Sequence, residues 1–252
     1  MKTIIILLIG ILTGNLLFAQ NSKFVTAGTI DYDKSVNMFA IGREILKSVQ
    51  TTSLSTVYAQ AFDQYKKTHP QFGVVKSTLI FANNKTLYTP GKTDNVVAFM
   101  GINLAVKQLS TVYTDLSANK RVVQKDIFDD RFLLTDSLSK ITWKIIGGSE
   151  DIAGYKCREA HGVIQDSVYI VAFYTDRIRI NSGPESFSGL PGMILKLVLP
   201  NEHITWTATK VTENIAATIE PPKKGKPLTN KDFYNLLKKA GQAGNTLKLH
   251  ML

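Results

Sequence analysis

The chain has 252 residues, of which 44% are hydrophobic and 20% are charged, and its formal net charge at pH 7 is +10. A chain of this length buries about 70% of its unfolded surface, so it forms one domain, or at most two, without a disulfide or a metal to hold it together. With 17 glycines, 8 prolines and no low-complexity tract or fixed repeat, the sequence excludes disordered, collagen-like and solenoid proteins.

Residues 1–19 are typical of a secretory signal peptide. Lys2 gives a short positive start, the apolar run Ile4–Leu12 is too short to span a bilayer, and Ala19 suits the residue before a cleavage site. The alternative is an uncleaved anchor helix, but Gly14-Asn15 interrupts the apolar run. No later segment is apolar enough to cross a membrane, so we expect an exported protein that is not membrane-spanning. It would lie in the periplasm, at the outer membrane, or outside the cell as a secreted protein.

Cys157 is the single cysteine, so the chain cannot form an internal disulfide. Because no second cysteine or flanking histidine would activate the thiol, we expect Cys157 to be buried and inert. The alternative is a thiol that awaits a partner.

Part of the positive charge is concentrated at the C-terminus, where residues 220–252 hold seven lysines and two acidic residues. Outside the cytoplasm, such a tail could meet lipid phosphate, acidic glycans or an acidic protein surface. Nucleic acid is not an expected partner there. The other interpretation is a solvated face that keeps the protein soluble.

The first part of the mature chain predicts a strand followed by helix. Residues 25–37 are rich in β-branched side chains and alternate between apolar and polar, as a half-buried strand does. Apolar residues then recur every three or four positions from Ile41 to Tyr65, with an interruption at Thr51-Thr52-Ser53, and the pattern stops before His69-Pro70. The spacing predicts one long N-terminal helix, with two short helices as the alternative.

From Gln71 onward the hydrophobic period is two, which predicts strands. Asn83-Asn84 between two apolar runs is a hairpin signal, and Pro90-Gly91 closes that unit. Because the expected strands are short and no helices separate them, they predict an antiparallel meander and not a parallel sheet. The expected strands are residues 73–81, 85–88, 109–116, 121–128, 131–135, 141–146, 154–162, 167–175, 193–199 and 204–211.

The C-terminal part begins with a linker, Pro221–Pro227, which is rich in proline and lysine. Thr229 suits a helix N-cap with Asp232 at the capping-box position, and Phe233 and Leu236 belong to a short apolar stripe. A short C-terminal helix is therefore expected.

The expected fold class is α+β, with a curved antiparallel β-sheet that forms a half-barrel. The long N-terminal helix and the short C-terminal helix would lie against the concave face, because a sheet must cover an apolar face. The expected organisation is a signal peptide (1–19), a single β-rich domain (20–220) and a basic linker with the C-terminal helix (221–252).

The most specific stretch of the sequence precedes the apolar strand at residues 193–199. Leu190-Pro191-Gly192 fits a type II turn, in which proline sets φ at the second position and glycine supplies a positive φ at the third. The surrounding glycines could bring backbone N–H groups close to a ligand or partner, or the turn could be a rigid corner that directs the strand into the core. The residues expected to bind a ligand or partner are Gly183, Pro184, Phe187, Gly189, Leu190, Pro191 and Gly192.

The hexapeptide Gly189–Ile194 resembles the signature of the GLPGLI family of secreted proteins of Gram-negative bacteria, with Met193 where the family name has leucine. Arg177 and Arg179 stand where that family more often has acidic residues or proline. The resemblance implies an exported, largely uncharacterised protein that often occurs alongside outer-membrane TonB-dependent transport, and a shape similar to the half-barrels of lipoprotein carriers. It supplies no catalytic residues. Similar flanking segments are Ile141–Lys144, Ile152–Ala160, Phe173–Thr175 and Gly183-Pro184.

The sequence does not point to an enzyme. His69, His161, His203 and His250 have no spacing that would place two of them on one helix face or strand side, so no metal is expected. The sequence also lacks the nucleophile elbow of serine hydrolases, the His-Glu-x-x-His pair of metalloproteases and a phosphate-binding glycine loop, so no cofactor is expected. His161 and His203 lie in or beside expected strands and are the first candidates to inspect.

Two functions remain. In the first, a non-catalytic envelope protein holds an apolar or extended ligand in the half-barrel, which Phe62 and Tyr65 or the C-terminal helix would cover. In the second, the protein is an interaction subunit that docks on an outer-membrane TonB-dependent receptor or the cell surface through the Gly183–Gly192 loop and the basic tail. An open apolar interior favours the first function, and a packed interior favours the second.

Overall fold

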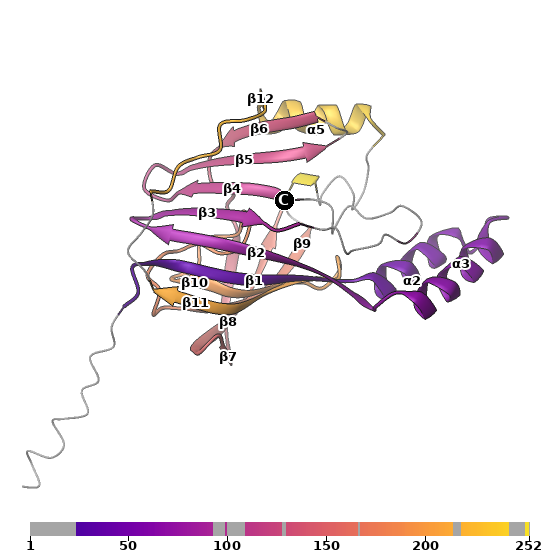
Figure 1. Cartoon of the computed structure of the whole chain (residues 1–252), viewed down its shortest axis with the longest axis horizontal. Coiled ribbons are helices and arrows are strands. Elements are labelled where there is room, and N and C mark those ends of the chain that lie inside the picture. Colours follow the sequence, from indigo (N-terminus) through magenta and orange to yellow (C-terminus); the bar gives the residue numbers. More distant parts are fainter. Residues whose placement is uncertain are drawn as a thin grey trace, which may run out of the picture.

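The computed structural model describes residues 24–92, 99, 109–127, 130–165, 167–213, 218–241 and 250–251. The expected signal peptide therefore lies outside the described residues. Most of the described chain forms a single large sheet, with a pair of helices beyond one end and a shorter helix beside one edge (Figure 1).

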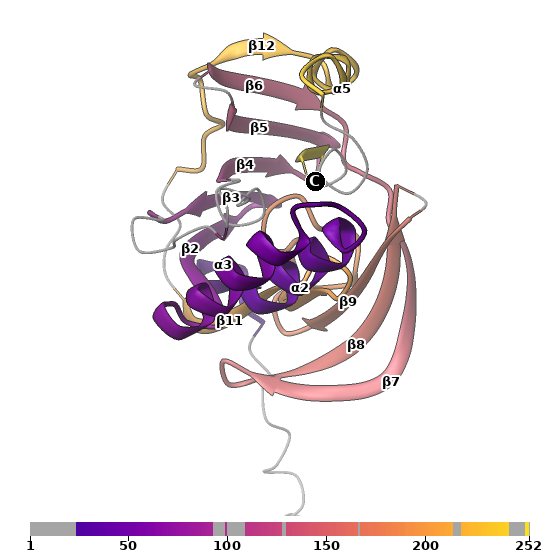
Figure 2. The same ribbon diagram turned by 90° about the vertical axis from the view of Figure 1, so that its right-hand side faces the viewer.

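Twelve strands form this open sheet in the order β12-β6-β5-β4-β3-β2-β1-β11-β10-β9-β8-β7. Each neighbouring pair is antiparallel except β12 and β6, which are parallel, so the sheet is mixed. The sheet bends along its width, so that β7, β8 and β9 turn away from the plane of β2 to β6 (Figure 2). The strands are β1 (Ala27–Asn37), β2 (Phe72–Ala82), β3 (Lys85–Pro90), β4 (Ser110–Asp115), β5 (Lys120–Ile127), β6 (Asp130–Asp136), β7 (Thr142–Ile152), β8 (Tyr155–Ile164), β9 (Val168–Thr175), β10 (Met193–Leu199), β11 (Ile204–Glu213) and β12 (Lys226–Leu228).

Two-residue turns build two of the hairpins of this sheet. Asn83 and Asn84 join β2 to β3 with φ values of 49° and 58°, and Ala153 and Gly154 join β7 to β8 with 49° and 84°. Positive φ at both central residues is the geometry of a type I′ turn, which matches the twist of the flanking strands. The hairpin signal read from Asn83-Asn84 is confirmed.

The expectation of a purely antiparallel half-barrel is wrong, because the sheet is open and, at one edge, β12 adds to β6 in parallel. Gly225 has a φ of 138°, and a Cβ there would lie against the backbone of Phe132, so glycine permits the close approach. Lys226 Nζ then lies 2.6 Å from Asp130 Oδ1. The sequence predicts only a linker here, because a strand of three residues shows no alternation.

The expected long N-terminal helix is also wrong, and the alternative of two short helices is correct. The helices are α2 (Met38–Val49) and α3 (Ser55–Thr68). Between them, the Thr52 hydroxyl donates to the Val49 carbonyl at 2.7 Å and accepts from the Leu54 N–H at 3.3 Å. A threonine side chain that bonds to nearby backbone competes with helical hydrogen bonds, so the chain turns there.

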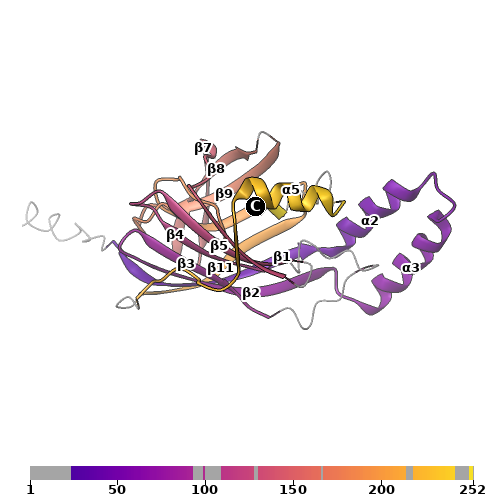
Figure 3. The ribbon, with the colours of Figure 1, turned by 90° about the horizontal axis from the view of Figure 1, so that it is seen from above.

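The α2–α3 pair projects beyond one end of the sheet and does not cover the concave face of the sheet, its inner face (Figures 1 and 3). Phe62 and Tyr65 are buried, but they pack within the pair and against Phe99. The Phe62 ring lies 6.2 Å from that of Phe39 and 5.2 Å from that of Phe99. The expected role of Phe62 and Tyr65 as a cover for a ligand cavity is therefore not supported.

The C-terminal helix α5 (Asn230–Lys239) forms as expected and packs on β6. Thr229 caps it by accepting from the Asp232 N–H at 3.1 Å, while the Thr229 hydroxyl donates to the Asp232 carboxylate at 2.7 Å. Phe233 is fully buried, with its ring 5.8 Å from that of Phe132. No helix in the described ranges is long and apolar enough to cross a membrane.

Candidate functional site

The connection between β9 and β10, residues 176–192, contains all seven residues that the sequence proposes for binding. Five of them are buried, and only Gly189 and Pro191 are exposed. Most of the proposed binding segment therefore faces the interior of the protein. The buried residues are Gly183, Pro184, Phe187, Leu190 and Gly192.

This β9–β10 connection crosses the inner face of the bent sheet and contacts strands from both halves. The hydroxyl groups of Ser182 and Thr86, on β3, lie 3.2 Å apart. The Trp143 indole N–H, on β7, donates to the Ser188 carbonyl at 3.0 Å. Burial of a connecting segment requires partners for its backbone; Trp143 supplies one for the Ser188 carbonyl, and the Ile194 N–H supplies one for the Ser182 carbonyl.

At the Leu190-Pro191-Gly192 corner, Gly192 has the positive φ that the sequence predicts, but the turn is closed by a hydrogen bond over fewer residues. The Gly192 N–H donates to the Leu190 carbonyl at 2.8 Å, which makes a γ-turn around Pro191 and not a type II turn. Gly192 has a φ of 151°, and a Cβ there would meet the Thr175 carbonyl. The corner directs β10 into the core, where Met193 is fully buried.

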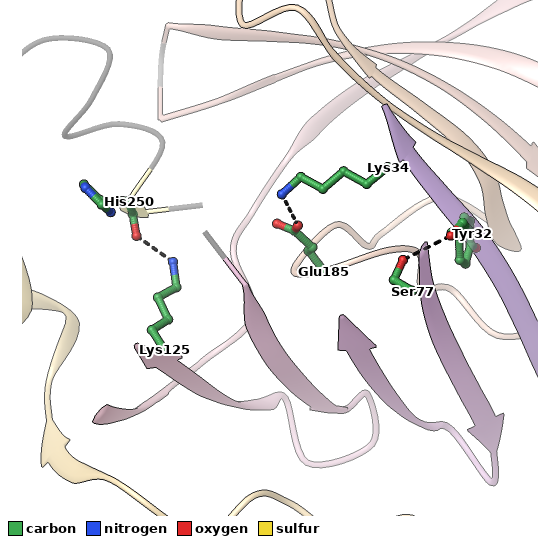
Figure 4. Close-up of polar contacts among 6 residues, drawn as sticks. All are labelled: Tyr32, Lys34, Ser77, Lys125, Glu185 and His250. Atoms are coloured by element: carbon green, nitrogen blue, oxygen red, sulfur yellow. Dashed lines mark hydrogen bonds and ion pairs between the residues drawn. The ribbon is translucent and has the colours of Figure 1, made fainter. Parts of the chain in front are cut away.

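A buried ion pair joins the β9–β10 connection to β1. Lys34 Nζ lies 2.9 Å from Glu185 Oε1, and the two side chains are 4% and 8% exposed (Figure 4). The Lys34 ammonium also lies 5.0 Å from the centre of the Trp206 ring. The sequence carried one signal for this pair, because Lys34 falls between Tyr32 and Val36 at the inward positions of the alternating strand.

A second buried lysine lies on β5 of the same inner face. Lys125 Nζ donates to the His250 carbonyl at 2.6 Å, near the end of the chain (Figure 4). Burial lowers the pKa of Lys125 to about 7, an effect that Glu185 opposes and that Arg121 and Lys34 reinforce. Burial, helped by the Lys125 charge, lowers the pKa of His250 to about 4.

The lowered pKa of Lys125 makes the stability of the fold depend on pH. Between pH 7 and 9, this lysine stays protonated in the unfolded chain and loses its proton in the folded chain. The contribution of Lys125 to the free energy of unfolding therefore rises with pH. We expect the wild type to show this rise in urea unfolding at pH 7, 8 and 9, with a slope of at most about 1.4 kcal/mol per pH unit. Lys125→Met should flatten the slope; an unchanged slope in that variant would assign the rise to another group.

A groove of about 1390 Å³ opens beside the β7–β8 hairpin. We call it the hairpin groove. Its walls come from β7 at residues 145–149, the start of β8 at Tyr155 and Arg158, the β9–β10 connection at Arg177 and Arg179, and Phe24 ahead of β1.

The hairpin groove offers apolar side chains, free space and backbone groups together. Ile145 is 53% exposed and Phe24 is 37% exposed, although both are large and apolar. A Cβ on Gly147 would meet no atom within 4 Å. The pairing of β7 with β8 is interrupted between Ile145 and Ser149, so the backbone of residues 146–148 lies outside that ladder. Such a surface can hold an extended chain.

Gly189, one of the two exposed residues of the proposed binding segment, lines a second hollow of about 740 Å³ together with Asn84 and Lys140. The prediction that Gly189 and Pro191 contact a ligand or partner remains a prediction. Of the five buried residues, Phe187 and Leu190 belong to the hydrophobic core, and a Cβ on Gly183 would meet the Ile194 side chain.

The expected burial of Cys157 is confirmed. The side chain is fully buried, and burial, together with the charges of Glu150 and Asp151, raises the pKa of the thiol to about 12. A thiol with this pKa stays protonated near neutral pH, which disfavours nucleophilic chemistry.

The two histidines singled out from the sequence contact separate sets of partners. His161 Nε2 lies 2.6 Å from Glu159 Oε1, and its Nδ1 lies 2.8 Å from the Tyr169 hydroxyl. His203 Nε2 lies 2.9 Å from Glu44 Oε1. Within the described ranges, His, Cys, Asp and Glu side chains form no group of three or more that could hold a metal ion.

One family model matches part of the sequence, and solved structures resemble the fold. A family model described as "Protein of unknown function (Porph_ging)" matches residues 159–196, which include β9 and the β9–β10 connection. No curated protein matches the chain. The GLPGLI resemblance of the motif remains a prediction.

Two solved structures, titled "Structure of PNGF-II in P21 space group" and "Structure of PNGF-II in C2 space group", are similar in fold. Their identities to this chain are 16% and 15%, and their TM-scores are 0.52 and 0.53. Each match covers 85% of this chain, but this chain spans only about a third of the matched chains (34% and 33%). At these identities the likeness concerns the fold alone, and the matched family model assigns no function.

Proposed function

We propose that the protein is a non-catalytic binding module of the cell envelope that captures an extended segment of a partner in the hairpin groove. The observation that carries this proposal is the groove itself, which combines exposed apolar side chains with backbone groups outside the β7–β8 ladder. The signal-peptide pattern of residues 1–19 supports the envelope location.

The packing of the inner face favours docking over the carriage of an apolar guest. Phe187 and Leu190 are each 1% exposed and belong to the core that covers this face. An apolar guest would have to displace these side chains, whereas a partner segment reaches the hairpin groove without any rearrangement of the core. The partner would be an outer-membrane transport component or another protein of the cell surface.

The proposal assigns the docking to other residues than the sequence does. The sequence assigns this role to the Gly183–Gly192 loop and the basic tail, but the loop is mostly internal and part of the tail is tied to the sheet through Lys226 and Asp130. The hairpin groove replaces the loop as the docking surface, and the β9–β10 connection supports it from within.

The proposal predicts that a tryptophan placed in the groove blocks binding. Gly147→Trp fills the space in front of residue 147, where an added Cβ meets no atom within 4 Å. We expect random dodecapeptides selected on the full chain to bind the wild type in fluorescence-anisotropy titrations and to lose binding to Gly147→Trp. The matched control is Val163→Trp, on β8 outside the groove, where the wild-type side chain is already 42% exposed.

Circular dichroism and thermal unfolding establish that both tryptophan variants are folded. Peptides that bind Gly147→Trp as tightly as the wild type would place the binding site elsewhere. A selection that enriches no peptide would remove the proposed function altogether.

A further inference from the structure

Two arginines project from a fixed piece of backbone into the hairpin groove. Arg177 and Arg179 are exposed and flank Ile178, which is fully buried. Val25 pairs with Ile178 in an isolated parallel bridge, and the Val25 N–H donates to the Arg177 carbonyl at 2.9 Å. Both arginines line the groove, on either side of the buried Ile178.

Arg179 is held against an aromatic ring. Its guanidinium carbon lies 3.3 Å from the centre of the Phe24 ring. A guanidinium that stacks on an aromatic ring keeps its N–H groups around the edge of the stack, where they can bind a carboxylate with two hydrogen bonds. Phe24 therefore orders the arginine before a ligand arrives, which reduces the entropy lost on binding.

The charges that line the groove favour an anionic occupant. The four cationic residues outnumber the two acidic ones, and Asp176 Oδ2 already lies 3.8 Å from the guanidinium of Arg158. Among the described residues, no carboxylate lies within ion-pair distance of Arg177 or Arg179. The cationic residues are Lys156, Arg158, Arg177 and Arg179, and the acidic ones are Asp176 and Glu213.

The same groove has the features that recognise a polypeptide. The backbone of residues 146–148, outside the β7–β8 ladder, can exchange hydrogen bonds with an extended chain, and Ile145 and Phe24 can pack against its apolar side chains. We propose that the hairpin groove binds an acidic, extended peptide segment whose carboxylates pair with Arg177 and Arg179. This inference rests on the proposed function and names the chemistry of the partner.

The test uses three fluorescein-labelled dodecapeptides in which threonine alternates with glutamate, glutamine or lysine. We expect the glutamate peptide to bind the full chain about tenfold or more tightly than the glutamine peptide, because each charge-assisted hydrogen bond adds affinity. The lysine peptide should not bind. Raising the salt concentration from about 0.1 M to about 1 M, which shortens the Debye length from about 10 Å to about 3 Å, should weaken the glutamate complex.

Variants distinguish a specific role of the two arginines from a general effect of positive charge. The double variant Arg177→Gln/Arg179→Gln should lose the preference for glutamate, and Arg179→Lys should lose part of it although the charge is kept, because lysine has no planar fork. The control Arg43→Gln removes an exposed arginine on α2, remote from the groove lining, and should leave the preference unchanged.

The outcomes distinguish this inference from the proposed function. If the glutamine and glutamate peptides bind equally and Gly147→Trp blocks both, the groove binds peptides and the inferred acidic preference is wrong. If a heparin fragment binds through Arg177 and Arg179 and the glutamate peptide does not, the ligand is an acidic glycan and the inference is wrong. If neither these peptides nor any library peptide binds, the proposed function fails as well.

Discussion

Replacing Phe187 with alanine should lower the free energy of unfolding by about 3–5 kcal/mol, the range for removing a buried aromatic side chain from a packed core. Phe187 is 1% exposed and its ring lies 5.9 Å from that of Trp206. The sequence suggests that Phe187 binds a ligand or partner, and in that role its loss would leave stability near the wild-type value. Urea unfolding followed by far-ultraviolet circular dichroism measures the difference.

Phe72→Ala is the matched control for this prediction. Phe72, at the start of β2, is 49% exposed, so its replacement should change stability by no more than about 0.5 kcal/mol. A Phe187→Ala variant as stable as Phe72→Ala would mean that the β9–β10 connection is not part of the core, and the packing role assigned to it would be wrong.

Replacing Glu185 with alanine should be comparably damaging, at about 3–5 kcal/mol, because it removes the carboxylate that faces a buried ammonium. Lys34 is 4% exposed and lies 2.9 Å from Glu185, so water does not readily replace the lost partner. The loss should appear in urea unfolding at pH 7, where an exposed ion pair contributes little. Glu220→Ala, which breaks the exposed Glu220–Lys223 pair, should leave stability unchanged.

A double variant tests whether the fold needs the ion pair itself or only the absence of an unpaired buried charge. Lys34→Met/Glu185→Leu replaces both charges with apolar side chains of similar length, and it should recover most of the stability lost in Glu185→Ala. The single variants Lys34→Met and Glu185→Leu, together with this double variant, form a cycle that gives the coupling energy. Single and double variants with additive losses would show that the two side chains do not act as a pair.

The strands were predictable because local pattern and tertiary environment agree along most of the chain. In β1, the alternation around Ile30 and Tyr32 matches the observed burial, and Thr229 caps α5 through the interaction that its sequence position suggests. The helix break at Thr52 was visible as an interruption, but its consequence depends on side-chain hydrogen bonds that periodicity does not describe. The short strand β12 forms through the close approach at Gly225, and no local pattern encodes that contact.

The candidate site was harder to predict, since its residues come together only in the folded sheet. Phe24 and Arg179 are distant in sequence, and the stack they form depends on the bridge between Val25 and Ile178. The sequence singled out the Gly183–Gly192 segment for binding, but turn residues fit a surface loop and a buried corner equally well. Its buried contacts with β1, β3 and β7 distinguish the two roles.

The placement of Glu185 against β1 has a kinetic consequence. The contact with Lys34 joins positions 151 residues apart, and the hydrogen bond from the Tyr32 hydroxyl to the Ile194 carbonyl joins positions 162 apart. Such contacts close long loops, and chains dominated by distant pairings cross their rate-limiting barrier in milliseconds to seconds and not in microseconds. Without the last third of the chain, β1 has neither its carboxylate partner nor its neighbour β11, so productive folding requires nearly the whole chain.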